Sequence, residues 1–304
     1  MAEPTALTGR WAPSPTGDLH IGNLRTALLA WLFARSRGGR FLWRFEDLDN
    51  AVRPEYYRRQ LADVAAMGMD WDGEPIRQSD RTELYQEALQ TLRATGLVYP
   101  CFCSRREIRD AVSAPHEYLS QGAYPGTCRD LTIAQVAKRS ESRRPAALRL
   151  RVSDVEVTIV DELLGSHTGY VDDVVLQRGD GTPAYNLVVV VDDADQGVTQ
   201  VVRADDLLAS TPRQIHIARL LGVEPPDYAH VPLVLNSDGQ RLAKRDGAVT
   251  LGDRIQLGES PIDVLNAILS SLNLGSLDSV DQLPRRAETF DPISLPQTSW
   301  IYSP

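Results

Sequence analysis

The feature that most constrains the fold is residues 10–49, RWAPSPTGDLHIGNLRTALLAWLFARSRGGRFLWRFEDLD. After a turn rich in proline and glycine, its apolar residues recur at helical spacing, and paired glycines end the helix. The next residues alternate as a strand does, with Phe41, Trp43 and Phe45 on one face. The stretch therefore predicts a strand, a turn, a helix and a second strand. Such β-α-β units bind their ligands at the first turn.

Three residues of that turn, His20, Gly22 and Asn23, meet the predicted start of the helix. Unpaired backbone N–H groups and partial positive charge at a helix N-terminus favour phosphate. Glycine lets a ligand approach the backbone closely, and histidine and asparagine side chains can each add a hydrogen bond. On these residues alone, a surface histidine beside a capping asparagine is the simpler interpretation.

Within the longer run APSPTGDLHIGN, the turn resembles the HIGH motif of class I aminoacyl-tRNA synthetases, in the form used by the glutamate and glutamine enzymes. The resemblance extends from residue 9 to about residue 270, nearly the whole chain. It implies that His20, Gly22 and Asn23 bind ATP, that His20 and Asn23 are catalytic, and that Mg²⁺ accompanies the nucleotide.

A second segment, residues 241–245 (RLAKR), is a basic loop of a kind common on solvated surfaces. It contains Lys244, and Lys138 is the only other lysine of the chain. The segment resembles the KMSKS loop of class I synthetases, with departures at Arg241 and Ala243. The resemblance implies that Arg241 and Lys244 bind ATP, and that Lys244 contacts the phosphates during adenylate formation. A mobile cation is the expected electrostatic device for phosphoryl chemistry.

Glutamate specificity is implied by residues scattered through the chain. Five positions match glutamate-binding residues of glutamyl-tRNA synthetases: Arg10, Ser14, Glu46, Tyr185 and Arg203. Glutamate carries two carboxylates and one ammonium, so its site needs guanidinium groups, an acid and a polar aromatic side chain. For each arginine taken alone, a surface ion pair of little energetic value is the alternative. The runs at residues 181–193 and 198–214 also resemble the glutamate enzymes.

Charge and hydropathy argue against some partners and cellular locations of the protein. The net charge of −9 argues against nonspecific coating of nucleic acid, which requires a basic face. No apolar run approaches the ~20 residues that cross a bilayer, and residues 1–9 lack the form of a signal peptide. We expect a cytoplasmic protein that contacts no membrane, and a monomer.

The three cysteines of the chain, Cys101, Cys103 and Cys128, lie close together in the sequence. In a cytoplasmic protein such clustering indicates a metal rather than a disulfide. Three thiolates leave one position of a tetrahedral structural zinc to fill, and His116 is the first chemical choice. The Cys-x-Cys…Tyr-x-x-x-Cys arrangement resembles the short paralogue of glutamyl-tRNA synthetase, which implies Tyr124 as the fourth ligand of one Zn²⁺. Three buried free thiols are the alternative.

Alternating strands and helices predict an α/β fold with a parallel sheet covered on both faces. The resemblance implies a class I synthetase fold, in which a Rossmann-like sheet carries an inserted zinc-containing module and a small helical C-terminal subdomain that contacts a tRNA stem. We divide the chain into the first catalytic half, the inserted acceptor-binding module, the second catalytic half with the KMSKS-like loop, and the stem-contact subdomain, at residues 1–95, 96–183, 184–245 and 246–304.

Individual elements follow from periodicity and turn residues. Capping-box spacing at Asp80 and Glu83 predicts a helix start, as it does at Ser104 and Glu107. Residues 188–191 fit either a buried strand or the start of a buried helix. Strands are predicted over residues 147–152, 155–160, 172–178, 198–203 and 231–235, and the final thirty residues show little periodicity.

Two features point to the short paralogue of glutamyl-tRNA synthetase. Only about sixty residues follow Arg245, whereas full-length enzymes continue into a long helical anticodon-binding region. Residues 203–208 (RADDLL) also look closer to the short paralogue than to the R-G-E-D-H run of full-length enzymes. The resemblance implies that glutamate is activated with ATP and Mg²⁺ without tRNA. It is then transferred to queuosine at the wobble position of tRNA(Asp), whose anticodon arm the catalytic domain would hold.

Three alternatives stay open. The chain could be a minimal glutamyl-tRNA synthetase that charges a tRNA 3′ end, or it could transfer glutamate to a carrier protein or a small amine. It could also be a non-catalytic tRNA-binding paralogue, although the intact His20 and Lys244 argue against that. No side chain stands out as the general base of the transfer step.

Overall fold

The computed structural model describes residues 7–112, 124–141, 144–242, 246–247 and 249–303. Its elements begin with β1 (Thr8–Trp11), α1 (Ile21–Arg35) and β2 (Arg40–Phe45), which confirms the predicted β-α-β unit. β1 and β2 pair in parallel, with Thr8 opposite Arg40. Both faces of β2 are covered, since Leu42 and Arg44 are buried as well as the aromatic residues.

Further parallel strands lie on either side of this pair. β3 (Ile76–Arg77) pairs with β2 and lies between α2 (Pro54–Ala66) and α3 (Thr82–Ala94), with a 3₁₀ helix at Gln78–Arg81. β9 (Gln200–Ala204) and β10 (Asp227–Val231) also pair in parallel, and α6 (Tyr185–Asp195) and α7 (Thr211–Leu221) precede and connect them. Thr199 N donates to Thr8 O at 2.9 Å, so the second pair adjoins β1.

Some predicted boundaries differ from the structure. No capping box opens α3, because the 3₁₀ helix runs directly into it and Arg81 occupies the N-cap position without a side-chain bond. Residues 188–191 are helical, within α6. The predicted strand at 231–235 is two elements, the end of β10 and β11 (Val234–Leu235). Pro232 stands between them, and a proline has no N–H to donate to a ladder.

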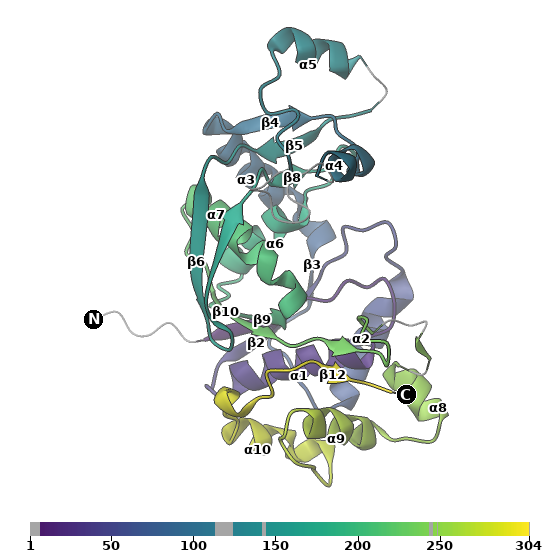
Figure 1. Ribbon diagram of the computed structural model, residues 1–304. Helices are drawn as coiled ribbons and strands as arrows, with labels where there is room; N and C mark the ends of the chain where they lie inside the picture. The colour runs from purple at the N-terminus through teal and green to yellow at the C-terminus, as the bar shows by residue number, and fades with distance from the viewer. Residues whose placement is uncertain (1–6, 113–123, 142–143, 243–245, 248, 304) are drawn as a thin grey trace, which may run out of the picture.

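An antiparallel sheet lies at one end of the molecule (Figure 1). It consists of β4 (Val98–Cys101), β5 (Ala147–Leu150) and β8 (Val175–Gln177), with α4 (Arg105–Val112) and α5 (Ile133–Ser140) beside it. The predicted capping box before α4 is confirmed. Ser104 N donates to Glu107 Oε2 at 2.6 Å, and Glu107 N donates to Ser104 Oγ at 3.1 Å.

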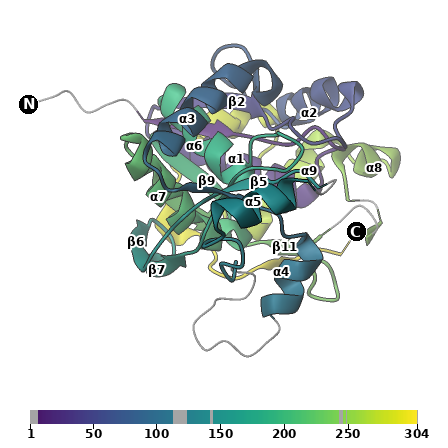
Figure 2. The same cartoon turned by 90° about the horizontal axis from the view of Figure 1, so that it is seen from above.

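A hairpin of β6 (Val155–Asp161) and β7 (Gly165–Val171) lies at the periphery, as does α4, whereas α1 and α6 are central (Figure 2). β7 escaped prediction because most of its side chains are exposed and few are apolar. The strand predicted over residues 172–178 is limited to β8. Asp172 and Asp173 instead direct their carboxylates to Tyr124 N and Val152 N, each at 2.8 Å.

The C-terminal part begins with α8 (Leu251–Gln256) and α9 (Pro261–Ser271). The final thirty residues are more regular than their weak periodicity predicts, since they contain α10 (Leu283–Glu288) and β12 (Trp300–Ile301), with 3₁₀ helices at Val280–Gln282 and Pro292–Ser294. β12 pairs in parallel with β11, and a pairing so distant in sequence leaves no local pattern. Trp300 N donates to Leu233 O at 3.1 Å, and Tyr302 N donates to Leu235 O at 2.8 Å.

The main apolar core surrounds α1, whose Leu24, Leu28 and Leu32 are fully buried. The helix packs between the parallel strands and the C-terminal helices, where the rings of Phe33 and Phe290 lie 5.4 Å apart. This packing holds the N-terminus of α1 at the end of β1. In the part of the chain that the structure describes, no helix is long and apolar enough to span a membrane.

Candidate active site

A cavity of about 420 Å³ lies where β1 and β9 end and α1 begins. All of the predicted ATP- and glutamate-binding residues that the structure describes line it: Arg10, Ser14, His20, Gly22, Asn23, Glu46, Tyr185, Arg203 and Arg241. Lys244 and its neighbour Ala243 lie outside the described residues. The fold thus gathers side chains from distant stretches of the sequence around one space.

The turn before α1 is closed by a capping box. Asn23 N donates to His20 Nδ1 at 3.1 Å, and His20 N donates to Asn23 Oδ1 at 3.2 Å. A Cβ at Gly22 would lie 3.0 Å from the His20 ring and 3.3 Å from Val234 Cβ, so glycine leaves the ring in place. The capping expected of Asn23 is therefore real, and it fixes both polar side chains at a helix N-terminus that favours phosphate.

The segments on both sides of the KMSKS-like loop lie at this turn. After the loop, Thr250 forms an antiparallel bridge with His20. At the first residue of the loop, the Arg241 guanidinium donates to Asp206 Oδ2 at 2.6 Å, and both side chains line the cavity. The described ends of the loop are thus anchored beside the residues of the first motif.

Arg203, in β9, is held by neutral groups. Its Nη1 donates to Gln214 Oε1 at 2.8 Å, its Nη2 to Thr211 Oγ1 at 2.7 Å, and its Nε to His230 Nε2 at 3.2 Å. The guanidinium also lies 5.2 Å from the centre of the Tyr228 ring. Among the described residues, no carboxylate lies within the 4.0 Å of an ion pair. The charge of Arg203 is therefore available to a carboxylate in the cavity.

A network of buried charges surrounds Glu46. The Arg44 side chain is fully buried, and it lies 2.7 Å from Asp193 Oδ1 and 3.9 Å from Glu46 Oε1. Arg10 Nε contacts the same Asp193 oxygen at 3.4 Å. Burial raises the pKa of Glu46 to about 7, although Arg44 and Arg10 oppose the increase. Ionised Glu46 could pair with an ammonium group in the cavity.

Ser14 and Tyr185 connect this cavity to a second. Tyr185 is the first residue of α6, and its side chain is exposed to the cavities. A space of about 670 Å³ shares Ser14, Glu46 and Tyr185 with the first cavity and extends to Cys103 and Arg149 of the antiparallel module. The lining therefore runs without a break from the predicted glutamate site to the antiparallel sheet of β4, β5 and β8.

Sequence reasoning missed the buried charges that support the cavity. Asp192 and Asp193 follow four valines, and Arg44 interrupts a run of large apolar residues. A charge in such a run is a readable signal, because burial is tolerated only with a partner. Asp161 and His230 give no such signal. Their side chains meet at 2.6 Å from positions 69 residues apart.

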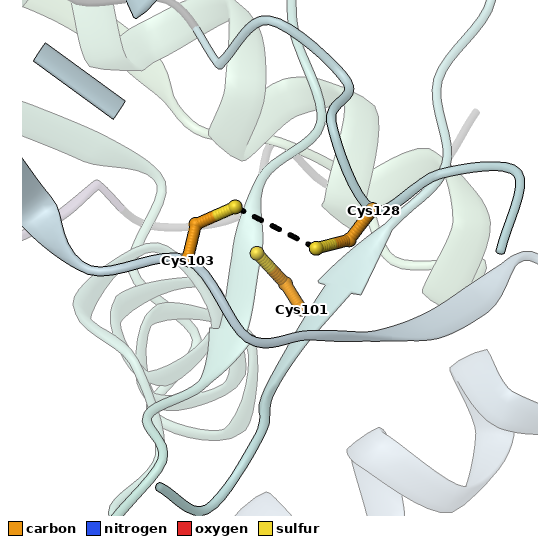
Figure 3. Close-up of side chains that lie close together, drawn as sticks. All are labelled: Cys101, Cys103 and Cys128. Carbon is orange, nitrogen blue, oxygen red and sulfur yellow. Dashed lines mark hydrogen bonds between the residues drawn. The ribbon is translucent and has the colours of Figure 1, made fainter. Parts of the chain in front are cut away.

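The three cysteines converge at the end of β4 (Figure 3). All three sulfurs lie within 4.8 Å of one another, and the Cys103 and Cys128 sulfurs are 3.5 Å apart. The Tyr124 hydroxyl lies 3.3 Å from Cys101 Sγ and 3.6 Å from Cys103 Sγ. Tetrahedral zinc with Zn–S bonds of about 2.3 Å spaces its sulfurs by about 3.8 Å. The cluster therefore fits a zinc ion, whereas His116 lies outside the described residues.

The chain has recognisable relatives. Residues 6–270 match a family model described as "tRNA synthetases class I (E and Q), catalytic domain". The chain belongs to this family. The class I synthetase fold expected from the sequence, a mixed α/β structure, is thereby confirmed.

Individual synthetases resemble the chain over most of its length. The glutamyl-Q tRNA(Asp) synthetase of Nocardia farcinica is 60% identical over 96% of this chain and 92% of its own. The enzyme of that name from Symbiobacterium thermophilum is 48% identical, over 88% and 87%. A crystal structure of a glutamate tRNA ligase from Elizabethkingia meningosepticum, in complex with its amino acid, has a TM-score of 0.80 and 26% identity, covering 98% of this chain and 67% of that one. The expected resemblance to the short paralogue is confirmed.

Proposed function

We propose that the chain activates glutamate with ATP and transfers it to queuosine at the wobble position of tRNA(Asp). The observation that carries this proposal is the cavity in which the HIGH-like turn meets charges suited to glutamate. The acceptor is suggested by the two glutamyl-Q tRNA(Asp) synthetases that the chain resembles, since both are named for tRNA(Asp).

Glutamate has three charges, and the cavity offers a partner for each. Arg203 and Arg10 are the guanidinium groups for the two carboxylates, and Glu46 is the acid for the ammonium. Tyr185 and Ser14 lie at the border with the second cavity, where they would close the site around the substrate. Holding the glutamate carboxylate against ATP supplies much of the rate, because alignment removes the entropic cost of the encounter.

In the first step, the glutamate carboxylate attacks the α-phosphorus of ATP and releases pyrophosphate. His20, Gly22 and Asn23 would bind the phosphates at the α1 N-terminus, while Arg241 and Lys244 would approach from the loop. Mg²⁺ bound with the nucleotide would supply neutralisation of the phosphate charge beside these residues. In the second step, a hydroxyl of the queuosine cyclopentenediol attacks the activated carbonyl and releases AMP.

The second cavity is the route for the acceptor. It begins at Ser14 and Tyr185, beside the predicted glutamate, and it is lined further on by Arg105, Arg149 and Arg178. Arginine side chains suit contacts with phosphates and bases of a single-stranded loop. We place the anticodon arm of tRNA(Asp) here, held by residues 96–183 as the acceptor-binding module, with residues 246–304 contacting the stem.

Zinc would hold the inserted module together. Cys101, Cys103 and Cys128 would be its thiolate ligands and the Tyr124 oxygen the fourth. Burial raises the pKa of the Cys103 thiol to about 12, so binding of the metal must displace that proton. The ion would join β4 to the segment that begins at Tyr124, and it takes no part in the chemistry.

The experiment that tests this function is transfer of labelled glutamate to bulk tRNA prepared with and without queuosine. Each tRNA is also trimmed of its 3′-terminal adenosine, which removes the ordinary acceptor. Periodate-treated samples complete the set, because periodate oxidises the cis-diols of the 3′ ribose and of the queuosine ring. We expect label on queuosine-containing tRNA(Asp), with or without the terminal adenosine, and none after periodate.

Other patterns would contradict the proposal in distinct ways. Label on tRNA(Glu) that depends on the terminal adenosine would identify a minimal glutamyl-tRNA synthetase. Glutamate-dependent exchange of pyrophosphate into ATP without any labelled tRNA would indicate another acceptor. Folded protein with neither activity would indicate a tRNA-binding role without catalysis.

A further inference from the structure

A series of buried, hydrogen-bonded side chains connects the peripheral hairpin to the cavity proposed to bind glutamate. Asp161 ends β6, His230 belongs to β10 and Arg203 belongs to β9. The side chains of Asp161 and His230 are fully buried, and Arg203 is 5% exposed. The hairpin lies beside β10 (Figure 1), where Glu162 N donates to Tyr228 O at 2.9 Å.

The hydrogen bonds that link Arg203, His230 and Asp161 permit only one tautomer of His230. Arg203 Nε can only donate, so His230 Nε2, 3.2 Å away, must accept. The proton therefore resides on His230 Nδ1, which donates to Asp161 Oδ2 at 2.6 Å. The Asp161 carboxylate is fixed in turn by the backbone N–H groups of His230, Leu163 and Leu164, each at 3.0 Å.

The same arrangement leaves Arg203 outside any ion pair among the described residues, although its charge helps to lower the pKa of the nearby Asp193, which contacts Arg44 and Arg10. Each nitrogen of the Arg203 guanidinium donates to a neutral acceptor, on His230, Gln214 or Thr211. Asp161 is the acid in this series of hydrogen-bonded side chains. The neutral imidazole of His230 separates its carboxylate from the Arg203 guanidinium. A carboxylate placed directly on Arg203 would fix its geometry equally well, but it would also neutralise the charge that a substrate needs.

We propose that His230 and Asp161 are positioning residues for glutamate, which act by holding Arg203 in the cavity as an oriented cation whose hydrogen bonds all go to neutral groups. The inference rests on the proposed function, because it requires Arg203 to bind a carboxylate of glutamate. It adds two residues that do not line the cavity, one of them from the inserted module.

The test is the Michaelis constant of each substrate in glutamate-dependent exchange of pyrophosphate into ATP, measured on the full chain. In His230→Asn, the amide can still donate to Asp161 but leaves Arg203 Nε without its acceptor. In His230→Gln, the longer side chain can bring an oxygen to the position of Nε2. Asp161→Asn can donate to His230 Nδ1 and thereby favour the wrong tautomer, with an N–H facing Arg203 Nε.

We expect the KM for glutamate to rise at least about tenfold in His230→Asn and Asp161→Asn, and less than about threefold in His230→Gln, since one charged hydrogen bond is lost or kept. The KM for ATP should stay within about twofold in all three. His216→Asn is the matched control, because His216 is a half-buried histidine of α7 outside the cavity. If His230→Asn does not fold, Asp161→Asn and His230→Gln decide the question.

Several outcomes would overturn the proposal. One is an unchanged KM for glutamate in both Asn variants while the unmodified chain is active. A second is an equal rise of the KM for glutamate in His230→Asn and His230→Gln. A third is a parallel rise of the KM values for glutamate and ATP. Either result would indicate only a structural role. Absence of exchange in the unmodified chain would instead contradict the proposed function, and the positioning role with it.

Discussion

At the scale of single residues, Lys244 offers the most direct test of adenylate formation. Removing its charge in Lys244→Ala should slow exchange by about 10²- to 10³-fold, because a transition-state cation is lost. The KM for glutamate should change less than about twofold, since the amino acid binds elsewhere. Lys138→Ala, in α5, is the matched control as the only other lysine. A large rise in the KM for glutamate would show that the loop assignment is wrong.

The raised pKa of Glu46 predicts that stability and glutamate affinity change with pH in opposite directions. Its pKa is raised by burial to about 7, so the carboxyl is protonated in the folded chain between pH 4.5 and 7. The folded state then binds more protons than the unfolded state, and the contribution of Glu46 to stability is lost as the pH rises through this window. Glutamate affinity should do the opposite, because only the ionised carboxylate attracts the substrate ammonium.

The measurements are the KM for glutamate from pH 6 to 8 and the urea unfolding midpoint from pH 4.5 to 7. We expect the KM to fall with rising pH, by up to about tenfold per pH unit below 7. Glu46→Gln should abolish the pH dependence of the KM for glutamate and reduce that of the unfolding midpoint. Asp63→Asn is a suitable control, since burial also raises the pKa of Asp63, to about 6, but the residue lies on α2 outside the cavity.

The side chains that line the cavity could be predicted from the sequence, whereas the buried side chains behind them could not. His20, Asn23 and Arg203 lie in runs whose pattern is specific enough to compare with a family. Asp161 and His230 occur in unremarkable strands, and their pairing depends on a hairpin docking against β10. Such tertiary contacts set the burial and charge of a side chain, and neither can be calculated from neighbours in sequence.

At the scale of elements, the cysteine cluster joins β4 to the segment that begins at Tyr124. We expect the purified chain to contain one zinc ion, and Cys128→Ser to contain none. Tyr124→Phe should keep the three thiolates but bind zinc at least about 10- to 100-fold more weakly, since loss of a ligand should cost no less than loss of a group that supports one. Zinc content after dialysis against a chelator measures both effects. Tyr170→Phe, at an exposed position of β7, serves as the control, and equal zinc loss there would contradict the ligand assignment.

Elements with strong local patterns were predicted, and those defined by distant partners were not. The helix after Ile21 is marked by its apolar spacing and its terminal glycines. The four valines before Asp192 fit two structures, and packing against α3 and α7 selects the helix. β7 and β12 are strands because of β6 and β11, so their own residues carry too little information.

At the scale of the whole molecule, β12 pairs with β11 beside the turn that precedes α1. Val234 of β11 lines the cavity and lies beside Gly22. Removing residues 300–304 loses this pairing and the buried Tyr302 ring, and should cost about 3 kcal/mol or more of unfolding free energy. We expect Tm to fall by roughly 6–12 °C.

Thermal unfolding of three chains would measure this contribution. Removal of residues 303–304 alone is the control, because it leaves Tyr302 and both β12 hydrogen bonds intact. Equal Tm values for the full chain and the chain ending at residue 299 would show that the C-terminal pairing contributes nothing to stability.

The neutral surroundings of Arg203 also bear on fidelity. Glutamine has nearly the volume of glutamate, but it brings one carboxylate instead of two to the guanidinium groups of Arg10 and Arg203. A missing methylene changes selectivity only by about 10- to 200-fold, whereas an unmatched polar group inside a site can exclude an analogue by about 10⁴ to 10⁵. An enzyme that recognises its amino acid by charge in this way can keep its error rate low at the first encounter, without a second site to hydrolyse mistakes.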